Sequence, residues 1–367
     1  MAAYAPRDRG VEPSIGVRGC ADAAIPSRHS AACVDLGLSR HVPVGVLSLL
    51  PLRRGDRKAL ATIITGERIQ RLADVTLISR ETLAFHRNVS RYAKEMTVFA
   101  ETMAELTDAA IQHLSRANSV FVYTHDVNSF IELVWPRLQR SIPILITHNS
   151  DWEITARHAS WLDTAGKEVR LWLAQNAAVR HPRIVPVPIG VSNTMWPHGN
   201  LHVLVRAMRR ARHRQRPPAS LFAQFSSSTH SSRGHAAAAL RTNFPGAHVD
   251  EAPALPWRDY LDALSAHRFS ACPRGNGIDI HRIWESLYLG VVPIVERSPL
   301  TEYWRAQGAP LVLIDNWDEV TPQRLECEAA HLNASAELPL LRLDTYRTII
   351  ERTVVGHDAS STSTPPA

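Results

Sequence analysis

Two short apolar runs with similar polar endings form the clearest pattern in the first half of the chain. Residues 119–123 (SVFVY) are followed by Thr-His-Asp, and residues 142–146 (IPILI) are followed by Thr-His-Asn-Ser-Asp. Between them, apolar residues recur at helical spacing from Phe130 to Leu138, and Pro136 is expected to kink or end the helix. Two buried strands joined by a helix predict a βαβ unit with a right-handed crossover.

Polar side chains at the ends of these two strands form the first candidate site. Both strands of a βαβ unit run in the same direction, so their carboxyl ends share the sheet edge where ligands bind in open α/β folds. That edge would carry His125, Asp126, His148 and Asp151. Asp151 is the first choice for a catalytic base at this edge, Asp126 is the second, and His148 belongs to the same catalytic set. The alternative is that these residues merely cap the helices that follow.

A loop, a helix and a buried strand are predicted in that order over residues 269–295 (FSACPRGNGIDIHRIWESLYLGVVPIV). Pro and Gly break regular structure at residues 272–277. A helix fits residues 281–289, whose apolar side chains fall on one stripe made of Ile283, Trp284, Leu287 and Tyr288. Gly290 stands where a helix end favours a left-handed residue, and the strand follows at residues 291–295.

Groups that can bind phosphate are concentrated at the start of this helix. A helix N-terminus offers unpaired N–H groups and a partial positive charge, and Gly275 and Gly277 allow a ligand to approach the backbone. Arg274 and Arg282 can add bidentate contacts to a diphosphate, and Glu285 can accept hydrogen bonds from two ribose hydroxyls. From the residues alone, a surface loop with an Arg–Glu pair on a solvated helix face is an equally good interpretation.

The same stretch resembles the C-terminal signature of the exostosin family of glycosyltransferases. The resemblance rests on Cys272-Pro273-Arg274-Gly275, Arg282, Trp284-Glu285, Gly290 and Val292-Pro293-Ile294-Val295. Ser286 departs from the usual alanine. The chain is most similar to the bacterial-type, exostosin-like branch, which carries Gly-Asn-Gly-Ile-Asp before His-Arg.

This resemblance implies an α/β protein with a GT-B-like fold, in which two Rossmann-like domains face a central cleft. The C-terminal domain would hold a nucleotide sugar, expected to be a UDP-sugar, and family members often place an arginine such as Arg233 after a Ser/Thr-rich turn. The implied donor-binding residues are Arg274, Gly275, Asn276, Gly277, Asp279, His281, Arg282, Glu285 and Arg233. Polysaccharide biosynthesis, by hexosyl or related transfer, is the natural expectation from the family.

Length and composition divide the chain into four segments. The 367 residues suit two domains of ordinary size. Residues 1–40 show no periodicity and are expected to be disordered, as is the Ser/Thr/Pro-rich tail at 355–367. Residues 41–195 are expected to form the acceptor-side domain and residues 200–354 the nucleotide-sugar-binding domain. Less distinct patterns predict strands at residues 44–50, 59–64 and 75–79, and helices at 92–114 and 169–175.

Charge and cysteine content limit the partners. The formal net charge of +6 comes from 41 basic and 35 acidic residues, an excess that fits anionic substrates or peripheral contact with an anionic membrane. No basic patch interleaved with aromatic residues favours nucleic acid. Four scattered cysteines indicate neither a disulfide framework nor a metal site, and no apolar run is long enough for a membrane span. The expected compartment is the cytoplasm.

These observations predict a metal-independent transfer of a sugar from a nucleotide-diphosphate sugar to a glycan or other hydroxyl acceptor. Arginines and a helix N-terminus can compensate the charge of the leaving diphosphate, so no cofactor or metal is expected. The nearest approach to an Asp-x-Asp metal motif is Asp151-Trp152-Glu153, which lies outside the donor motif. The sugar, the acceptor and the stereochemistry cannot be read from the sequence.

Three alternatives remain open at this point. A non-catalytic nucleotide-sugar-binding protein would share the donor site and lack turnover. A phosphatase or epimerase acting on a nucleotide sugar would need a catalytic pair that the sequence does not display. A basic scaffold or nucleic-acid-binding protein would bind polyanions with a steep dependence on salt.

Overall fold

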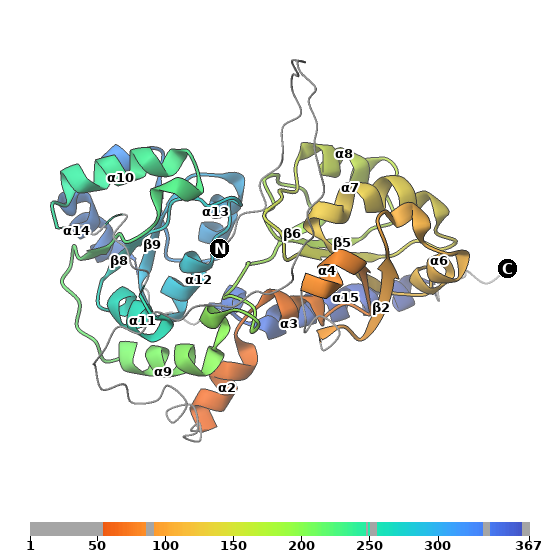
Figure 1. The fold of residues 1–367 in the computed structure, drawn as a ribbon, viewed down its shortest axis with the longest axis horizontal. Helices are drawn as coiled ribbons and strands as arrows, with labels where there is room; N and C mark the ends of the chain where they lie inside the picture. Colours follow the sequence, from red (N-terminus) through yellow and green to blue (C-terminus); the bar gives the residue numbers. More distant parts are fainter. Residues whose placement is uncertain (1–53, 86–91, 247–248, 250–254, 333–337, 362–367) are drawn as a thin grey trace, which may run out of the picture. The chain divides into compact units, whose positions relative to one another are not determined.

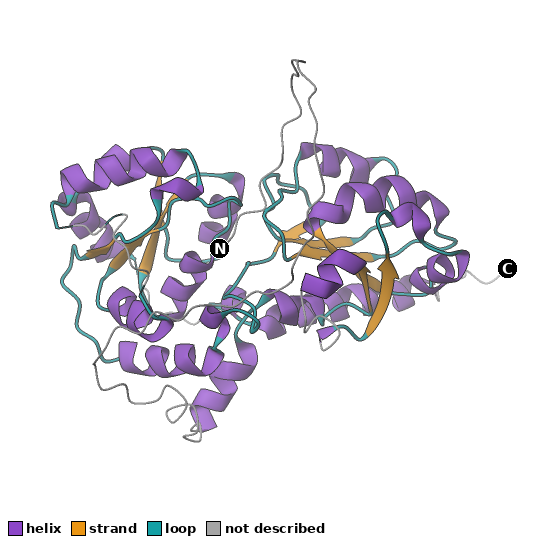
Figure 2. Ribbon diagram, viewed as in Figure 1, coloured by secondary structure: helices purple, strands orange, loops and turns teal. Residues whose placement is uncertain are grey.

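The computed structural model describes residues 54–85, 92–246, 249, 255–332 and 338–361 (Figure 1). The expected disordered segment at 1–40 and the expected strand at 44–50 lie outside these residues. All of the described residues belong to one compact unit. Within it, the strands belong to two parallel sheets, and Figure 2 shows the strands of each sheet lying among helices. The expected α/β class is therefore confirmed.

The first sheet contains six parallel strands in the order β2-β1-β3-β4-β5-β6. The strands are β1 (Val75–Ser79), β2 (Glu95–Phe99), β3 (Ser119–Tyr123), β4 (Ile144–His148), β5 (Leu171–Ala174) and β6 (Ile184–Pro186). Neighbouring β3 and β4 pair Tyr123 with His148, which confirms the predicted parallel unit and the shared carboxyl edge. The chain between them is helical in short pieces, α7 (Val127–Ser129), a π-helical turn (Phe130–Val134) and a 3₁₀ turn (Trp135–Arg137). The last turn ends one residue after Pro136, in agreement with the kink or early end expected at this proline.

The inner strands of this sheet are covered on both faces, which explains why β3 and β4 are mostly apolar. Along β3, Val120 and Val122 belong to one hydrophobic core, whereas Phe121 and Tyr123 belong to the other. The first core continues into α6 (Asp108–Leu114), α7 and α8 (Ala156–Asp163). The second continues into α3 (Gly66–Gln70) and α15 (Leu343–Ser361), which lie near one another in Figure 1.

Helix α15 departs from the expected division of the chain. Leu343, Tyr346 and Ile350 pack in the second core of the first sheet, although residues 200–354 were assigned to the other domain. The helix also continues to Ser361, so the tail expected to be disordered from residue 355 is helical in its first part. The boundary between domains at residues 195–200 stays a prediction.

The second sheet contains four parallel strands in the order β10-β9-β8-β7. They are β7 (Leu221–Phe222), β8 (Phe269–Ala271), β9 (Val292–Glu296) and β10 (Val312–Ile314). Helix α12 (His281–Tyr288) connects β8 to β9, so the predicted order of loop, helix and strand is confirmed. Gly290 ends the helix with φ of 70°, the left-handed conformation expected there. The other helices of this half are α9 (Leu201–Ala211), α10 (Ser232–Asn243), α11 (Trp257–Ser265), α13 (Pro299–Ala306) and α14 (Pro322–His331).

Three weaker predictions in the first half were wrong. Residues 59–64 fall mostly in helix α2 (Arg54–Thr62) rather than in a strand. The helix expected at 92–114 is instead β2, a 3₁₀ turn and α6, because Thr107 caps a new helix and alternate residues of β2 are buried. The helix expected at 169–175 is β5, since a run of four buried apolar residues fits either structure. Among the described residues, no helix combines the length and the apolar character needed to span a bilayer.

Candidate functional site

The loop that follows β4 contacts the loop that precedes α12. The Asn276 side chain donates from Nδ2 to Asp151 Oδ2 at 3.2 Å, and Arg274 Nη2 lies 3.0 Å from Glu153 Oε1. Asp151 and Asn276 are exposed, and the Arg274–Glu153 pair is about one-third exposed. The structure therefore brings together Asp151, predicted as a base, and two residues predicted to bind the donor.

Arg233 holds this loop through its backbone. From α10, its Nε donates to the carbonyl of Arg274 at 2.7 Å and its Nη2 to the carbonyl of Pro273 at 3.1 Å. Its Nη1 donates to the carbonyl of Ser226 at 3.1 Å, and its guanidinium lies over the ring of Phe225. Only 9% of Arg233 is exposed, so these contacts fix the loop that carries Arg274.

The two glycines of the loop are buried rather than open to a ligand. A methyl group on Gly277 would lie 2.7 Å from Nδ2 of Asn176, so this glycine lets an asparagine side chain approach the backbone. The N–H of Gly275 donates to the carbonyl of Gly277 at 3.1 Å, which closes the turn. The close approach to the backbone that was predicted for a ligand is made at Gly277 by the side chain of Asn176.

Asp279 and His281 attach the same loop to the chain that follows β6. Asp279 accepts from Ile189 N at 2.6 Å and from Trp284 Nε1 at 2.7 Å, and its burial raises the pKa of the carboxyl to about 7. His281 Nδ1 lies 2.8 Å from the carbonyl of Gly190, and burial lowers the pKa of its imidazole. Both residues were predicted to bind the donor, and the structure gives them protein partners.

Arg282 and Glu285 lie one turn apart on α12 and share the hydroxyl of Tyr260. Arg282 Nε donates to this hydroxyl at 3.1 Å, and the hydroxyl donates to Glu285 Oε2 at 2.8 Å. The Arg282 guanidinium is half-buried and packs over the rings of Phe222 and Tyr260. Glu285 is only 5% exposed, and its burial raises the pKa of its carboxyl to about 7. Arg282 is therefore held in a fixed position, whereas Glu285 is mostly covered.

His148 has a structural environment that does not fit the predicted catalytic role. The residue is completely buried, and its Nδ1 accepts the N–H of Asn149 at 2.8 Å. Its Nε2 therefore carries the proton and donates to the carbonyl of Pro188 at 2.9 Å. Burial lowers the pKa of His148 to about 4, so the ring is neutral and both nitrogens are engaged. An acceptor hydroxyl cannot reach either nitrogen in this conformation.

Asp126 lies at the end of β3, next to β4, as predicted. Its Oδ2 contacts His125 Nε2 at 3.5 Å, and burial raises the pKa of its carboxyl. The nearby hydroxyl of Thr124 is buried and has no hydrogen-bond partner among the described residues. Asp126 thus remains the second candidate for a base, with a more covered carboxyl than that of Asp151.

Sequence reasoning missed two asparagines that organise the carboxyl edge. Asn149 and Asn176 have positive φ values of 60° and 53°, a conformation that asparagine accepts more readily than most residues. Asn176 accepts from Asp279 N at 2.9 Å and donates to the carbonyl of Ser150 at 3.1 Å. It therefore joins the loops that follow β4 and precede α12. The available signal was the position of each asparagine just after a buried strand.

The candidate site is identified by its charged groups rather than by a cavity. A cavity of about 840 Å³ lies elsewhere, at the amino ends of β1 and β3, and none of the predicted site residues lines it. In the part of the chain that the structure describes, no group of three His, Cys, Asp or Glu residues is arranged to hold a metal ion.

No protein-family model matches the sequence. No curated protein matches it either. Among solved structures, the chain is similar to one titled as the crystal structure of an α1,3-fucosyltransferase, at 11% sequence identity and a TM-score of 0.40. The match covers 76% of this chain and 89% of the other. None of these comparisons supports the exostosin family. The resemblance at residues 272–295 therefore rests on the sequence pattern alone.

Proposed function

We propose that this protein is a glycosyltransferase that moves a sugar from a nucleotide-diphosphate sugar to a hydroxyl acceptor. The observation that carries the proposal is the contact of Arg274 and Asn276 with Glu153 and Asp151. Transfer requires a cation near the leaving diphosphate and a base near the incoming hydroxyl. The contact provides both kinds of group at the carboxyl end of β4, the edge where ligands bind in parallel sheets.

The two arginines have different roles in this proposal. Arg282 is held by Tyr260 and donates from Nη1 to the carbonyl of Ala271 at 3.3 Å. In this proposal, these contacts position its guanidinium at the end of β8 to bind the diphosphate. Arg274 is paired with Glu153 and must exchange this carboxylate for a phosphate oxygen when the donor binds. Glu285, predicted to bind the ribose, acts in this geometry on the position of Arg282 through the Tyr260 hydroxyl.

Asp151 is the proposed base because its carboxylate is exposed and adjacent to the donor loop. An ionised carboxylate can accept the proton of an acceptor hydroxyl as the hydroxyl attacks the sugar. The positive charge of Arg274 and Arg282 supports a reaction that does not depend on a metal, and a UDP-sugar is the first donor to test.

The test is a thermal-shift panel with UDP-, GDP-, CMP- and dTDP-sugars in EDTA, on the wild type and on Arg282→Ala. Arg216→Ala is a matched control, because Arg216 is a half-buried arginine bound to the carbonyls of Leu289 and Gly290 at the other end of α12. A ligand that binds the folded form raises the melting temperature. We expect a shift with one nucleotide family in the wild type and in Arg216→Ala, and none in Arg282→Ala. No shift with any donor in folded protein would refute the proposal.

A non-catalytic nucleotide-sugar-binding protein is the second candidate, since the burial of His148 removes one of the three predicted catalytic residues. Nucleoside diphosphate release in the presence of acceptors separates the two. The enzyme should release nucleotide with an acceptor present, and Asp151→Asn should abolish release while donor binding persists. Donor binding without release across a broad acceptor set would favour the binding protein.

A further inference from the structure

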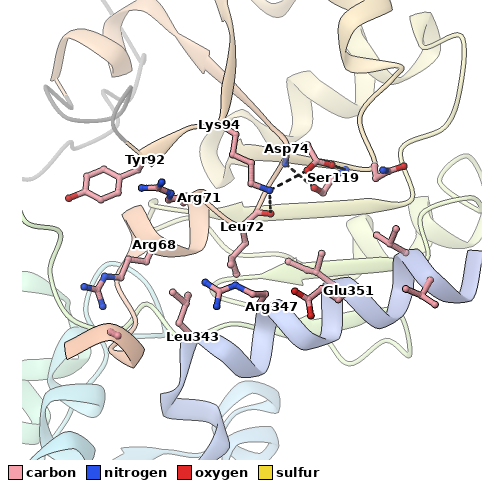
Figure 3. A pocket seen from close by; sticks show the side chains of 15 residues that line it. Arg68, Arg71, Leu72, Asp74, Tyr92, Lys94, Ser119, Leu343, Arg347 and Glu351 are labelled. Carbon is pink, nitrogen blue, oxygen red and sulfur yellow. Dashed lines mark hydrogen bonds and ion pairs between the residues drawn. The ribbon is translucent and has the colours of Figure 1, made fainter. Parts of the chain in front are cut away.

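A large cavity lies at the edge of the first sheet opposite the candidate site (Figure 3). Asp74 and Ser119, at the amino ends of β1 and β3, form part of its wall, and residues of α15 form another part. Its volume is about 840 Å³. The proposed glycosyl transfer uses none of the residues that line it.

Positive charge dominates the lining. The basic residues are Arg68, Arg71, Lys94 and Arg347, and the acidic residues are Asp74 and Glu351. Asp74 is already engaged, because it pairs with Lys94 at 3.3 Å and accepts the N–H of Ser119 at 3.2 Å. Figure 3 shows the basic side chains on both sides of the cavity. Basic residues therefore outnumber acidic ones in the lining, and a ligand that enters would meet a net positive charge.

Arg71 is the clearest unsatisfied group. Its side chain is exposed and makes no hydrogen bond or ion pair with the described residues. Arg347, on α15, is exposed and pairs only with Asp344 on its own helix, at 2.9 Å. A surface ion pair of this kind contributes little and is easily exchanged for a stronger anion. Both guanidinium groups are therefore available to a phosphate.

Apolar side chains complete the cavity. Leu72, Leu343 and Ile350 line its buried part, and Val354 and Val355 continue the apolar surface along α15. Val355 is 66% exposed. Cations beside exposed apolar side chains match a ligand that carries an anionic group on an apolar body.

We propose that this cavity binds an anionic phospholipid and places the first sheet on a membrane surface. The lipid phosphate would be bound by Arg71 and Arg347, and the start of the acyl chains would contact Val354 and Val355. A volume of about 840 Å³ is much larger than a phosphate alone requires and is in the usual range for small-molecule binding pockets. A soluble phosphate is the other source of the same anionic chemistry.

The test is flotation of the full chain with vesicles of phosphatidylcholine alone or mixed with phosphatidylglycerol. We expect binding to the anionic vesicles only, and a roughly tenfold or larger loss in Arg71→Ala/Arg347→Ala, since each basic residue at an anionic surface contributes roughly fivefold. Arg80→Ala/Arg352→Ala is the matched control, because both arginines are exposed, neither lines the cavity, and Arg352 is also on α15. Unchanged melting temperatures would show that all variants are folded.

Three results would overturn the proposal. Equal binding to both vesicle types would show that the negative charge is not recognised. An equal loss in the control pair would assign binding to net charge rather than to this cavity. Displacement of the protein from vesicles by millimolar glycerol 3-phosphate, together with unchanged vesicle binding by Val355→Ser, would identify a soluble phosphate as the ligand.

Discussion

The chain after β4 and the chain after β8 both carry polar residues past the end of a strand, but the two differ in what those residues contact. His148, the last residue of β4, is buried and neutral, with both ring nitrogens bound to backbone groups. Asp151, three residues further on, is exposed. After β8, Cys272 and Pro273 are buried, and Arg274 is the first residue whose charged group reaches solvent. In both loops, the first charged group that reaches solvent lies three residues past the strand end, whereas Asp279, further along the second loop, is buried again.

The largest effect should come from a substitution on the supporting side. Gly190 has φ of 68°, and a methyl group there would lie 2.3 Å from the carbonyl oxygen of Ile64. Gly190→Ala should therefore lower the free energy of unfolding by at least about 3 kcal/mol, measured by urea unfolding. Gly234→Ala is the control, because nothing lies within 4 Å of an added methyl in helix α10, and alanine there should stabilise by about 0.5–1 kcal/mol. Similar losses of stability in Gly190→Ala and Gly234→Ala would contradict the requirement for glycine at position 190.

His148→Gln should reduce stability by about 2–3 kcal/mol at pH 7.5, because it disturbs two buried hydrogen bonds. The pKa of His148 is about 4 in the folded protein and about 6.5 when unfolded, so the wild type loses stability as pH falls through this window. Glutamine does not titrate. The difference in the free energy of unfolding between the wild type and His148→Gln should therefore narrow by about 2 kcal/mol at pH 5. Urea unfolding at both pH values checks this, with exposed His202→Gln as the control. A difference in stability that is constant with pH would show that the pKa of His148 is not lowered in the folded protein.

Tyr260→Phe tests the group that connects Arg282 to Glu285. The Tyr260 hydroxyl lowers the pKa of Glu285, which burial has raised to about 7, so removing the hydroxyl raises this pKa further. A raised carboxyl pKa costs stability as pH increases from the unfolded value towards the folded one. The variant should lose about 1–2 kcal/mol at pH 8 and less at pH 5.5. If Tyr260→Phe lost more stability at pH 5.5 than at pH 8, ionisation of Glu285 could not be the cause of the loss.

The smallest effect should come from Glu153→Gln on the exposed side. Loss of a partly exposed ion pair should change stability by less than about 1 kcal/mol. If the proposed function is right, Arg274 no longer has to leave a carboxylate, and nucleotide-diphosphate affinity should rise about two- to fivefold. Titration calorimetry measures this change. Glu132→Gln removes a comparable exposed partner of Arg157 elsewhere and should leave affinity unchanged. Weaker binding by Glu153→Gln would mean that Glu153 itself contacts the donor.

Apolar runs and turn residues predicted the elements around the site. The pairing of β3 with β4, the helix at His281–Tyr288 and the left-handed Gly290 all follow from local patterns, and all were confirmed. The expected helix at 92–114 failed because a strand and two short helices can mimic helical spacing over a long window.

The roles of individual polar residues could not be predicted in the same way. Asp279 and His281 find their partners at Ile189 and Gly190, about ninety positions away in the sequence. Arg233 finds its partners among backbone carbonyls, which leave no trace in the side-chain pattern. A motif can therefore locate a site, whereas the division between supporting and exposed residues needs the tertiary contacts.

Helix α15 has a consequence for the order in which this protein can fold during synthesis. The strands of the first sheet are complete at Pro186, yet part of one face is covered by residues that begin at Leu343. Part of the core that contains Ile78 and Phe121 must therefore remain incomplete while more than one hundred further residues leave the ribosome. We expect the nascent first half to bind chaperones until α15 docks on the sheet. The first half should reach its full stability only when α15 has been synthesised.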